Sequence, residues 1–464
     1  MVKILSSSSV SYCKLLQGCA NAVCTFSLML LLAGFSRDAF AQADVLTVYR
    51  GATLIDGTDH APQSNVSILV RAERIEAIRP AAELPPAGSK VVDVSGLYIL
   101  PGLINTHVHI ATATTREQAL SLMRRDLYSG VTAERDMAGD TRQLAELARA
   151  ALLGEVAGPD IYYAALMAGP SFFKDPRTHA AARGAVAGNV PWMKAVTPQT
   201  DLHIAVAEAR GTGATAIKIY ADLSPELVGA ITREAHSQGM LVWAHATVFP
   251  ATAMQVAEVG VDSVSHAAML AITDPPNTYA ESHLHPAAEE MYTNGLGPQL
   301  PGLLQEMKRR GTILDATLFV YKDIPASNAK HPEIHPVDTL DLAARATHAA
   351  YETGVPISTG TDSEDEKNKD WSPLRDELVL LQDKAGMRPE DVIHSATAVG
   401  ARTIGQYTNL GTVEPGKLAD LVFLTKNPLD GVQAFSTVVL TVKRGNQFWR
   451  RDYESNDKND QAGK

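Results

Sequence analysis

Residues 97–109 have the sequence Leu97-Tyr98-Ile99-Leu100-Pro101-Gly102-Leu103-Ile104-Asn105-Thr106-His107-Val108-His109. The apolar part of this stretch, residues 97–106, predicts a buried strand. Side chains alternate between the two faces of a strand, so His107 and His109 project from the same face near its C-terminal end. Two imidazoles on one face can bind one divalent metal ion. A single His-x-His pair is a weak signal, so the prediction of a metal site depends on the rest of the chain.

The composition is ordinary for a globular protein with a large core. Hydrophobic residues make up 45% of the 464 residues, and charged residues make up 20%. The formal net charge is -11 at pH 7, and the lysines and arginines are scattered along the chain. These features argue against nucleic acid and anionic membranes as partners, because both select clustered basic residues. The composition is compatible with a small-molecule partner.

The first 41 residues have the features of a secretory signal peptide. Lys3 and Lys14 are the charged residues that precede an apolar stretch at 23–35, and Ala39-Phe40-Ala41 follows as a small-x-small cleavage pattern. We expect cleavage near Ala41 and a secreted or periplasmic mature protein. The apolar stretch is short for a membrane span, so we expect no stable membrane insertion after cleavage. An uncleaved anchor stays an alternative.

All three cysteines, Cys13, Cys19 and Cys24, lie within the segment that this cleavage would remove. The mature chain would then contain no thiol. A metal site in it must therefore use nitrogen and oxygen ligands rather than sulfur.

Two kinds of segment follow residue 41. Residues 42–100 and 406–464 contain short apolar strands separated by Gly, Pro and Asp-Gly pairs, and we expect them to combine into one small β-sandwich. Residues 101–405 alternate short apolar strands with helical segments, which predicts an α/β fold of the TIM-like (β/α)8 barrel type. The candidate barrel strands are 97–106, 129–135, 160–166, 214–221, 240–246, 261–267, 312–318 and 355–361.

Polar side chains with metal-binding chemistry occupy the ends of several candidate strands. Lys218 and Tyr220 share one face of the fourth strand, and His245 ends the fifth. His266 ends the sixth strand, and Asp362 follows the eighth. The C-terminal ends of parallel barrel strands meet at one mouth, so we expect these side chains to converge. Imidazole nitrogens and carboxylate oxygens are ligands that zinc and similar divalent ions accept.

The lysine in this set needs a chemical change before it can bind metal. A free ammonium carries three protons and no lone pair. A lysine that has reacted with CO2 is a carbamate, whose two oxygens can bridge two metal ions. Taken alone, Lys218 has the alternative of a salt bridge with Asp222 or another acidic residue.

These residues resemble the amidohydrolase superfamily in its binuclear, carboxylated-lysine form, and more narrowly its imidazolonepropionase-like and prolidase-like branch. The resemblance covers nearly all of the expected mature chain. The matching positions are 101–109, 130–136, Lys218, His245, His266, 360–362 and 416–422. The sixth strand departs from the pattern at Val264-Ser265-His266-Ala267, because relatives often have a glutamate before this histidine and a glycine after it. The departure leaves the ligand in place and affects the substrate side.

The resemblance implies two divalent metal ions, most simply zinc, with the carbamate of Lys218 between them. In this scheme one ion is held by two histidines of the first strand, and the other by the histidines of the fifth and sixth strands. The resemblance also implies that the chain can form a homo-oligomer. The implied metal ligands are His107, His109, Lys218, His245, His266 and Asp362.

The same resemblance implies hydrolysis of an amide or peptide C–N bond by a hydroxide that bridges the metals. Asp362 is expected to take the proton of the attacking water and return it to the leaving nitrogen. We hypothesise that the Tyr220 hydroxyl stabilises the tetrahedral oxyanion. Asp136, by contrast, is expected to hydrogen-bond backbone near the barrel mouth without a catalytic role.

Two long loops at the expected barrel mouth are candidates for substrate selection. An arginine there can pair with a substrate carboxylate through two hydrogen bonds, as an enzyme acting on dipeptides or N-acyl amino acids would need. The loop at 169–196 carries Lys174, Arg177 and Arg183, and the loop at 270–301 carries Tyr279 and Tyr292.

Two alternatives to amide hydrolysis stay open at this point. The first is hydrolysis of a lactone, carbamate or cyclic amide at the same metals. The second is a secreted metal-binding protein without catalysis. The chain keeps every expected ligand and also Asp362, which argues against this alternative.

Overall fold

The computed structural model describes residues 45–282, 295–322, 339–363 and 370–453. Within the chain, Leu46–Lys464 is one compact unit. This unit is not divided at residue 100 or residue 405. The predicted boundaries between the barrel segment and the two end segments therefore stay predictions. The predicted signal peptide with its cleavage near Ala41, and Tyr292, lie outside the described residues.

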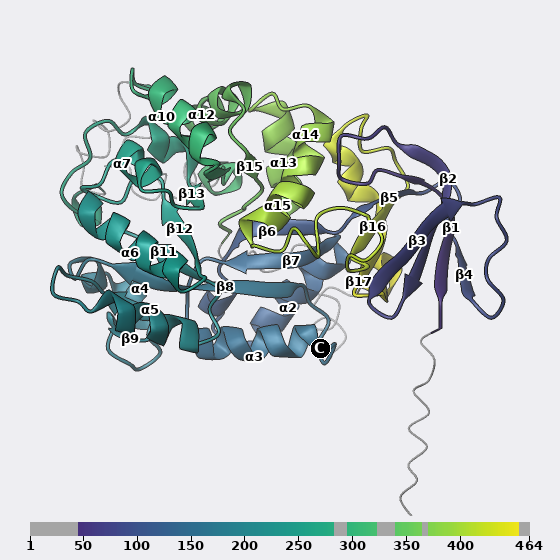
Figure 1. The fold of residues 1–464 in the computed structure, drawn as a ribbon, viewed down its shortest axis with the longest axis horizontal. Helices are drawn as coiled ribbons and strands as arrows, with labels where there is room; N and C mark the ends of the chain where they lie inside the picture. Colours follow the sequence, from purple (N-terminus) through teal and green to yellow (C-terminus); the bar gives the residue numbers. More distant parts are fainter. Residues whose placement is uncertain (1–44, 283–294, 323–338, 364–369, 454–464) are drawn as a thin grey trace, which may run out of the picture. The chain divides into compact units, whose positions relative to one another are not determined.

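Eight parallel strands form the central sheet, and each pairs with the next along the chain (Figure 1). Backbone hydrogen bonds join the last strand to the first: Thr106 donates to the carbonyl of Thr359, and Asp362 donates to the carbonyl of His107, both at 2.9 Å. The sheet is thus a nearly closed barrel, and the predicted TIM-like fold is confirmed. The strands are β6 (Leu103–Val108), β7 (Val131–Asp136), β8 (Asp160–Ala168), β11 (Ala216–Ile219), β12 (Leu241–His245), β13 (Ser263–Ser265), β14 (Ile313–Asp315) and β15 (Ile357–Ser358).

The stretch at 97–106, expected to be one barrel strand, is two strands that belong to different sheets. β5 (Tyr98–Pro101) pairs with strands from the two ends of the chain, and β6 begins the barrel after Gly102. A side chain at Gly102 would collide with Thr132, because a Cβ built there lies 2.2 Å from its Oγ1. The prediction of a single strand was therefore wrong, since an apolar run gives no sign of a change of sheet when both sheets bury it.

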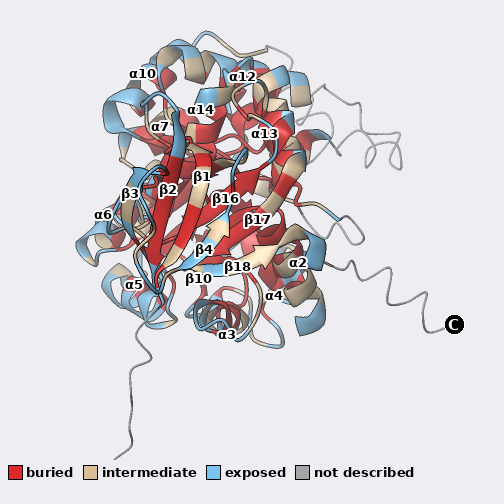
Figure 2. Cartoon of the chain, turned by 90° about the vertical axis from the view of Figure 1, so that its right-hand side faces the viewer, coloured by how far each residue is buried: buried red, intermediate tan, exposed pale blue. Residues whose placement is uncertain are grey.

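The two ends of the chain combine as expected, and their strands form one continuous eight-stranded sheet. Strands from the start and the end of the sequence lie side by side: Ile99 of β5 pairs with Phe423 of β16 (Figure 1). Much of β1, β2, β16 and β17 is buried (Figure 2). Besides β5, the strands are β1 (Thr47–Leu54), β2 (Gln63–Arg71), β3 (Arg74–Pro80), β4 (Lys90–Asp93), β16 (Leu421–Leu424), β17 (Val438–Lys443) and β18 (Asn446–Trp449).

Helices follow the barrel strands, and polar side chains cap many of their first turns. Thr115, Asp140, Asp175, Asp201 and Ser224 each accept a hydrogen bond from a backbone N–H of the helix that they precede, which satisfies a donor that has no partner within the helix. The helices are α2 (Arg116–Tyr128), α3 (Thr141–Leu152), α4 (Pro176–Ala181), α5 (Leu202–Gly211), α6 (Pro225–Ser237), α7 (Ala253–Glu258), α8 (Tyr279–Ser282), α10 (Leu300–Arg310), α12 (Thr339–Thr353), α13 (Leu374–Asp383), α14 (Pro389–His394) and α15 (Gly400–Thr403).

Short elements complete the connections between these strands and helices. Two-residue β9 (Asn189–Val190) and three-residue β10 (Met193–Ala195) form a hairpin that extends the barrel sheet beside β8. The short helical turns are η1 (Ile110–Thr112), η2 (Phe172–Lys174), η3 (Ala267–Ala271), η4 (Ser395–Val399), η5 (Val432–Thr437) and η6 (Arg450–Asp452).

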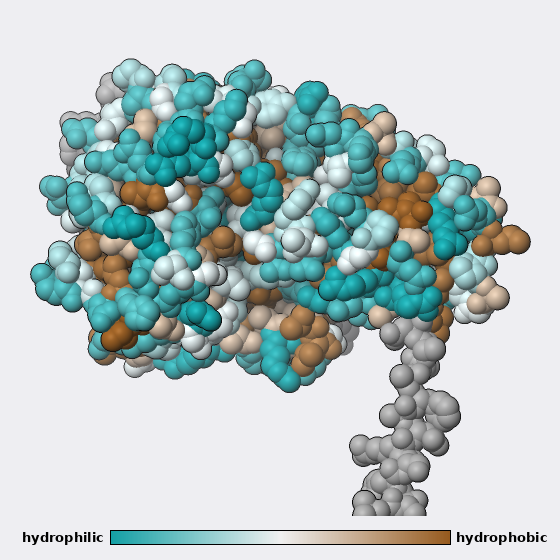
Figure 3. Space-filling view, viewed as in Figure 1, coloured by the Kyte–Doolittle hydropathy of each residue, from teal (hydrophilic) through white to brown (hydrophobic). Residues whose placement is uncertain are grey.

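The barrel and the end-segment sheet share buried apolar residues. Leu100, Val422 and Val438 from that sheet belong to the same hydrophobic cluster as the barrel core. The face seen in Figure 3 is largely hydrophilic, with apolar residues in small groups. Among the described residues, no helix is long and apolar enough to span a membrane.

Candidate active site

The six residues expected to bind metal lie at the C-terminal ends of five barrel strands. Three of these residues belong to buried strands near their C-terminal ends, and three come after such strands. His266 and Asp362 have positive φ angles of 76° and 49°, which are rare for residues with a side chain and cluster at functional sites. Their positions are His107 in β6, His109 after β6, Lys218 in β11, His245 at the end of β12, His266 after β13 and Asp362 after β15.

Asp362 lies at the centre of three histidines. Its Oδ1 is 2.9 Å from Nε2 of His109 and 3.3 Å from Nε2 of His107. Its Oδ2 is 3.8 Å from Nδ1 of His266. Ligand atoms of His107, His266 and Asp362 lie within 4.8 Å of one another, which is close enough for one metal ion to contact all three.

His245 and Lys218 lie close to His266. The ring centroids of His245 and His266 are 4.8 Å apart. Within the described part of the chain, Nδ1 of His245 and Nζ of Lys218 are buried and have no hydrogen-bond partner. A buried polar atom without a partner carries a desolvation cost, so both atoms are suited to a ligand or a modification that would satisfy them.

Burial keeps the site histidines in the form that can bind metal. It lowers the pKa of His107, lowers that of His266 to about 3, and lowers that of His245 well below its ordinary value. Burial also lowers the pKa of Lys218 to about 7, with the Arg135 charge acting in the same direction. Neutral imidazoles have a free lone pair, and a neutral amine is the form of lysine that reacts with CO2.

Asp362 is ionised in the same surroundings. Burial alone would raise its pKa, but the interaction with His107, a hydrogen bond from His109 and the interaction with His266 hold it far below the ordinary value. An ionised carboxylate can accept a proton, which is the property that a general base needs.

Asp315 is a site residue that the sequence analysis missed. It ends β14, is fully buried, and its Oδ2 lies 2.7 Å from Nδ1 of His107. It also accepts hydrogen bonds from Thr106, Ser265 and Arg135 at 2.8 Å each. Because Asp315 accepts the Nδ1 proton of His107, the Nε2 lone pair of that ring faces Asp362. Asp315 lies in the middle of the seventh candidate strand, 312–318, so it was not recognised as a residue at a strand end, and a lone aspartate has no distinctive spacing.

Arg135 supports the same arrangement from β7. Its guanidinium is fully buried and donates to Ser263, Asp315 and the carbonyl of Thr106. Its charge, with the hydrogen bonds to His107 and Ser265, outweighs the effect of burial and lowers the pKa of Asp315 to about 2.

Aromatic rings line one side of the histidines. The Tyr220 ring lies 4.0 Å from His245 and stacks on Phe172 at 4.4 Å. Tyr279 is 5.5 Å from Tyr220 and 6.2 Å from His245, measured between ring centroids. Burial and the neighbouring Tyr279 raise the pKa of Tyr220 well above its ordinary value, so its hydroxyl is a hydrogen-bond donor.

Two expectations about nearby acidic residues can be compared with the structure. Asp136 accepts hydrogen bonds from the backbone N–H groups of Ala111 and Ala138, as expected. Asp222 does not pair with Lys218: it accepts hydrogen bonds from the Ser171 hydroxyl and the Tyr279 N–H, both at 2.6 Å. The structure therefore does not contain the alternative salt bridge between Lys218 and Asp222.

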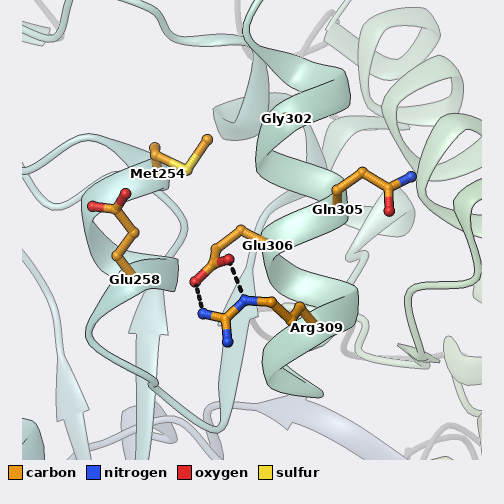
Figure 4. Close-up of a pocket in the computed structure, with 6 residues that line it drawn as sticks. All are labelled: Met254, Glu258, Gly302, Gln305, Glu306 and Arg309. Atoms are coloured by element: carbon orange, nitrogen blue, oxygen red, sulfur yellow. Dashed lines mark hydrogen bonds and ion pairs between the residues drawn. The ribbon is translucent and has the colours of Figure 1, made fainter.

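A separate surface hollow lies between α7 and α10 (Figure 4). Of its two acidic residues, Glu258 and Glu306, the second pairs with Arg309 and Arg310. The hollow shares no residue with the histidine group, and we assign it no function.

Comparison with known proteins identifies the family. Residues 98–448 match the Amidohydrolase family. The chain belongs to the amidohydrolase family. It is therefore a hydrolase that acts on carbon–nitrogen bonds, and the predicted family and branch are confirmed.

Individual relatives agree with this assignment and differ in identity and in how much of each chain is matched. The chain is 30% identical to the imidazolonepropionase of Thermoplasma acidophilum over 131 residues, which are 25% of this chain and 30% of that enzyme. It is 26% identical to a probable guanine deaminase of Deinococcus radiodurans over 418 residues, 83% of this chain and 85% of that protein. A crystal structure of a Xaa-Pro dipeptidase with bound methionine has the same fold, with a TM-score of 0.68, 24% identity, and coverage of 87% of this chain and 100% of that one.

Proposed function

We propose that this protein hydrolyses the amide or peptide C–N bond of a small molecule such as a dipeptide or an N-acyl amino acid. The observation that carries the proposal is the buried amine of Lys218, which has no hydrogen-bond partner among the described residues and interacts electrostatically with His245, His266 and Asp362. A lysine in this setting fits carbamate formation, and its carbamate would supply the oxygen ligands that the histidines lack.

The donor set fits two divalent cations, and we propose zinc. His107 and His109 would hold one ion with Asp362, while His245 and His266 would hold the other, and modified Lys218 would contact both. When bound, such ions lower the pKa of a water molecule and polarise a carbonyl oxygen. The neutral state of the buried histidines is the state that this role needs.

Two side chains of the site have separate roles in the reaction, namely proton transfer and stabilisation of negative charge. Asp362 accepts a proton from the attacking water and returns it to the leaving nitrogen, as the new C–O bond forms and the C–N bond breaks. The Tyr220 hydroxyl donates a hydrogen bond to the oxygen that becomes negative in the tetrahedral state. An unchanged kcat in Tyr220→Phe would contradict that role.

Metal analysis of the wild type and of Lys218→Ala tests the proposal. The wild type, purified with bicarbonate, should contain two transition-metal ions per chain and hydrolyse members of a panel of dipeptides and N-acyl amino acids. Lys218→Ala should lose metal and at least about 100-fold in kcat/KM, because ligand loss is expected to exceed the 10–100-fold cost of losing an outer partner. Lys194→Ala, which removes an amine paired with Glu208 at 3.2 Å, is the matched control.

Three results would contradict parts of this proposal. Absence of stoichiometric metal, or full activity of Lys218→Ala, would contradict the metal centre. Two metals with hydrolysis of only lactones, carbamates or cyclic amides would move the chain to the first alternative. Two metals with no hydrolysis at all would favour a metal-binding protein.

We also propose that the protein is exported and that the mature chain begins after Ala41. The support is the charge and apolar pattern of residues 1–41. N-terminal sequencing of the protein from a cell fraction outside the cytoplasm should give Gln42 as the first residue. The same sample, measured by light scattering, tests the proposed homo-oligomer.

A further inference from the structure

An arginine lies beside the aromatic side of the histidine group. Arg177, in the first turn of α4, has its guanidinium 5.9 Å from the ring centroid of Tyr279. The Tyr279 ring in turn lies 6.2 Å from the His245 ring, measured between centroids, so the arginine and an expected metal ligand are neighbours of the same tyrosine.

The Arg177 side chain is held in place and still offers donors. Asp175, the residue that caps α4, accepts hydrogen bonds from Nε and Nη2 of Arg177 at 2.7–3.2 Å. A guanidinium has five N–H groups in a rigid fork, so these bonds orient it without using all of its donors. About 61% of the side chain is exposed, so an incoming anion can reach it.

The other two basic residues of this loop are less suited to the same role. Arg183 donates two hydrogen bonds to the backbone carbonyls of Ala111 and Ala113, at 3.2 and 2.7 Å, so it stabilises the loop that follows β6. Lys174 is a point charge on a flexible stem and cannot form a planar two-bond contact with a carboxylate. Geometry therefore selects Arg177 among the three candidates.

We infer that Arg177 binds the free carboxylate of the substrate, and that Phe172, Tyr220 and Tyr279 contact an apolar or aromatic side chain on the same residue. The inference rests on the proposed function and narrows its substrate class to N-acyl amino acids and dipeptides with an apolar C-terminal residue. In such a molecule the carboxylate lies roughly 3.5 Å along the chain from the scissile carbonyl, the length of one residue. One residue is thus the spacer between the acyl carbonyl, which we expect near His245, and the carboxylate, which we expect at Arg177.

A pair of probes that differ by one carboxylate tests the inference. N-acetylphenylalanine and N-acetylphenethylamine share the acetyl group and the phenyl ring, and acetate release reports hydrolysis of both. Arg177→Ala should lower kcat/KM for N-acetylphenylalanine by about 10- to 100-fold, the range for a lost hydrogen bond to a charged group. It should change kcat/KM for N-acetylphenethylamine by less than about 2-fold. Arg177→Lys, which keeps the charge without the fork, should fall between the wild type and Arg177→Ala.

Arg142→Ala is the matched control. Arg142 pairs with Asp140 through the same cap arrangement at the start of α3, and its guanidinium lies 4.5 Å from the Trp192 ring, not against Tyr279. Arg142→Ala should leave unchanged the ratio of the kcat/KM for N-acetylphenylalanine to that for N-acetylphenethylamine. This result would exclude a general effect of removing positive charge.

The outcomes separate this inference from the proposed function. Equal losses for both probes in Arg177→Ala would show that Arg177 only positions Tyr279, and no loss would show that it has no role. Both results overturn the inference while hydrolysis by the wild type upholds the proposed function. If the wild type releases acetate from neither probe and cleaves no dipeptide ending in phenylalanine, the substrate class itself is wrong.

Discussion

Asp315 is the side chain that connects the histidine group to the interior of the barrel. It accepts hydrogen bonds from His107, Arg135, Thr106 and Ser265, and it is fully buried. A carboxylate beside a ligating histidine fixes the ring and its tautomer. We therefore expect Asp315 to act through His107, as a positioning residue.

Asp315→Asn should weaken both metal binding and folding. Loss of the carboxylate beside His107 should reduce metal affinity about 10- to 100-fold. The buried guanidinium of Arg135 would lose its ionic partner, which costs about 3–5 kcal/mol of unfolding free energy. Chelator competition and urea denaturation measure the two effects.

Asp376→Asn is the control for this change. Asp376 forms a partly exposed ion pair with Lys322 at 3.1 Å, and exposed pairs contribute little to stability. If Asp315→Asn binds metal as tightly as this control, the positioning role is wrong.

The residues of the site differ in how well the sequence predicts them. His107, His109, His245 and His266 end or follow predicted strands and Lys218 lies near the end of one, so the strand pattern predicts that they meet at one mouth. The structure brings these side chains together with Asp362. Arg177 could be suggested only as one of three basic residues in its loop, because loop positions have no period from which a direction can be inferred.

A buried carboxyl group joins helix α13 to the segment that follows β14. Glu377 of α13 accepts hydrogen bonds from the backbone N–H groups of Leu318 and Phe319, at 3.1 and 2.6 Å. Burial outweighs these bonds and raises the pKa of Glu377 to about 8 from an ordinary value of 4.5. The folded chain thus keeps a proton that the unfolded chain releases at lower pH.

Glu377→Gln should therefore reduce the dependence of stability on pH. Between pH 4.5 and 8 the folded wild type binds more protons at this position than the unfolded chain does, so its unfolding free energy falls as the pH rises. Glutamine does not titrate, and the fall should be smaller by at least about 1 kcal/mol, since one pKa unit corresponds to about 1.4 kcal/mol. Urea denaturation at pH 5.5 and pH 8 gives the comparison. Parallel pH profiles for the two proteins would show that Glu377 has an ordinary pKa.

The elements themselves follow from sequence patterns except where two sheets meet. All eight barrel strands lie within or overlap the expected segments, because short apolar runs separated by helical periods are typical of this fold. β18 was not expected, since Asn446–Trp449 alternates too briefly to stand out. The passage from β5 to β6 at Gly102 was missed for a different reason: both sheets bury the chain, so its hydrophobicity does not change.

The shared core predicts that the barrel and the end-segment sheet unfold together. Phe423 of β16 is fully buried and its ring lies 5.2 Å from Tyr49. Phe423→Ala should cost about 3–5 kcal/mol. Since Val422 and Leu424 beside it belong to the barrel cluster, the loss of hydrolytic activity and of far-UV circular dichroism should shift to lower urea together.

Leu84→Ala provides the control, because Leu84 is 86% exposed. Activity that survives in urea after the circular dichroism of the sheet has been lost would show two separate transitions.

The distribution of the site along the sequence has a consequence for synthesis on the ribosome. His107 leaves the ribosome early, but the strand that closes the barrel beside it, β15, and Asp362 come about 250 residues later, and β16, the partner of β5, later still. Partners so distant in sequence cannot pair before both have been made, and such long-range pairing is slow. A nascent chain of 350 residues thus carries five of the six expected ligands without a closed barrel to hold them. Under the proposed function, capture of metal and reaction of Lys218 with CO2 would accordingly follow translation of nearly the whole polypeptide.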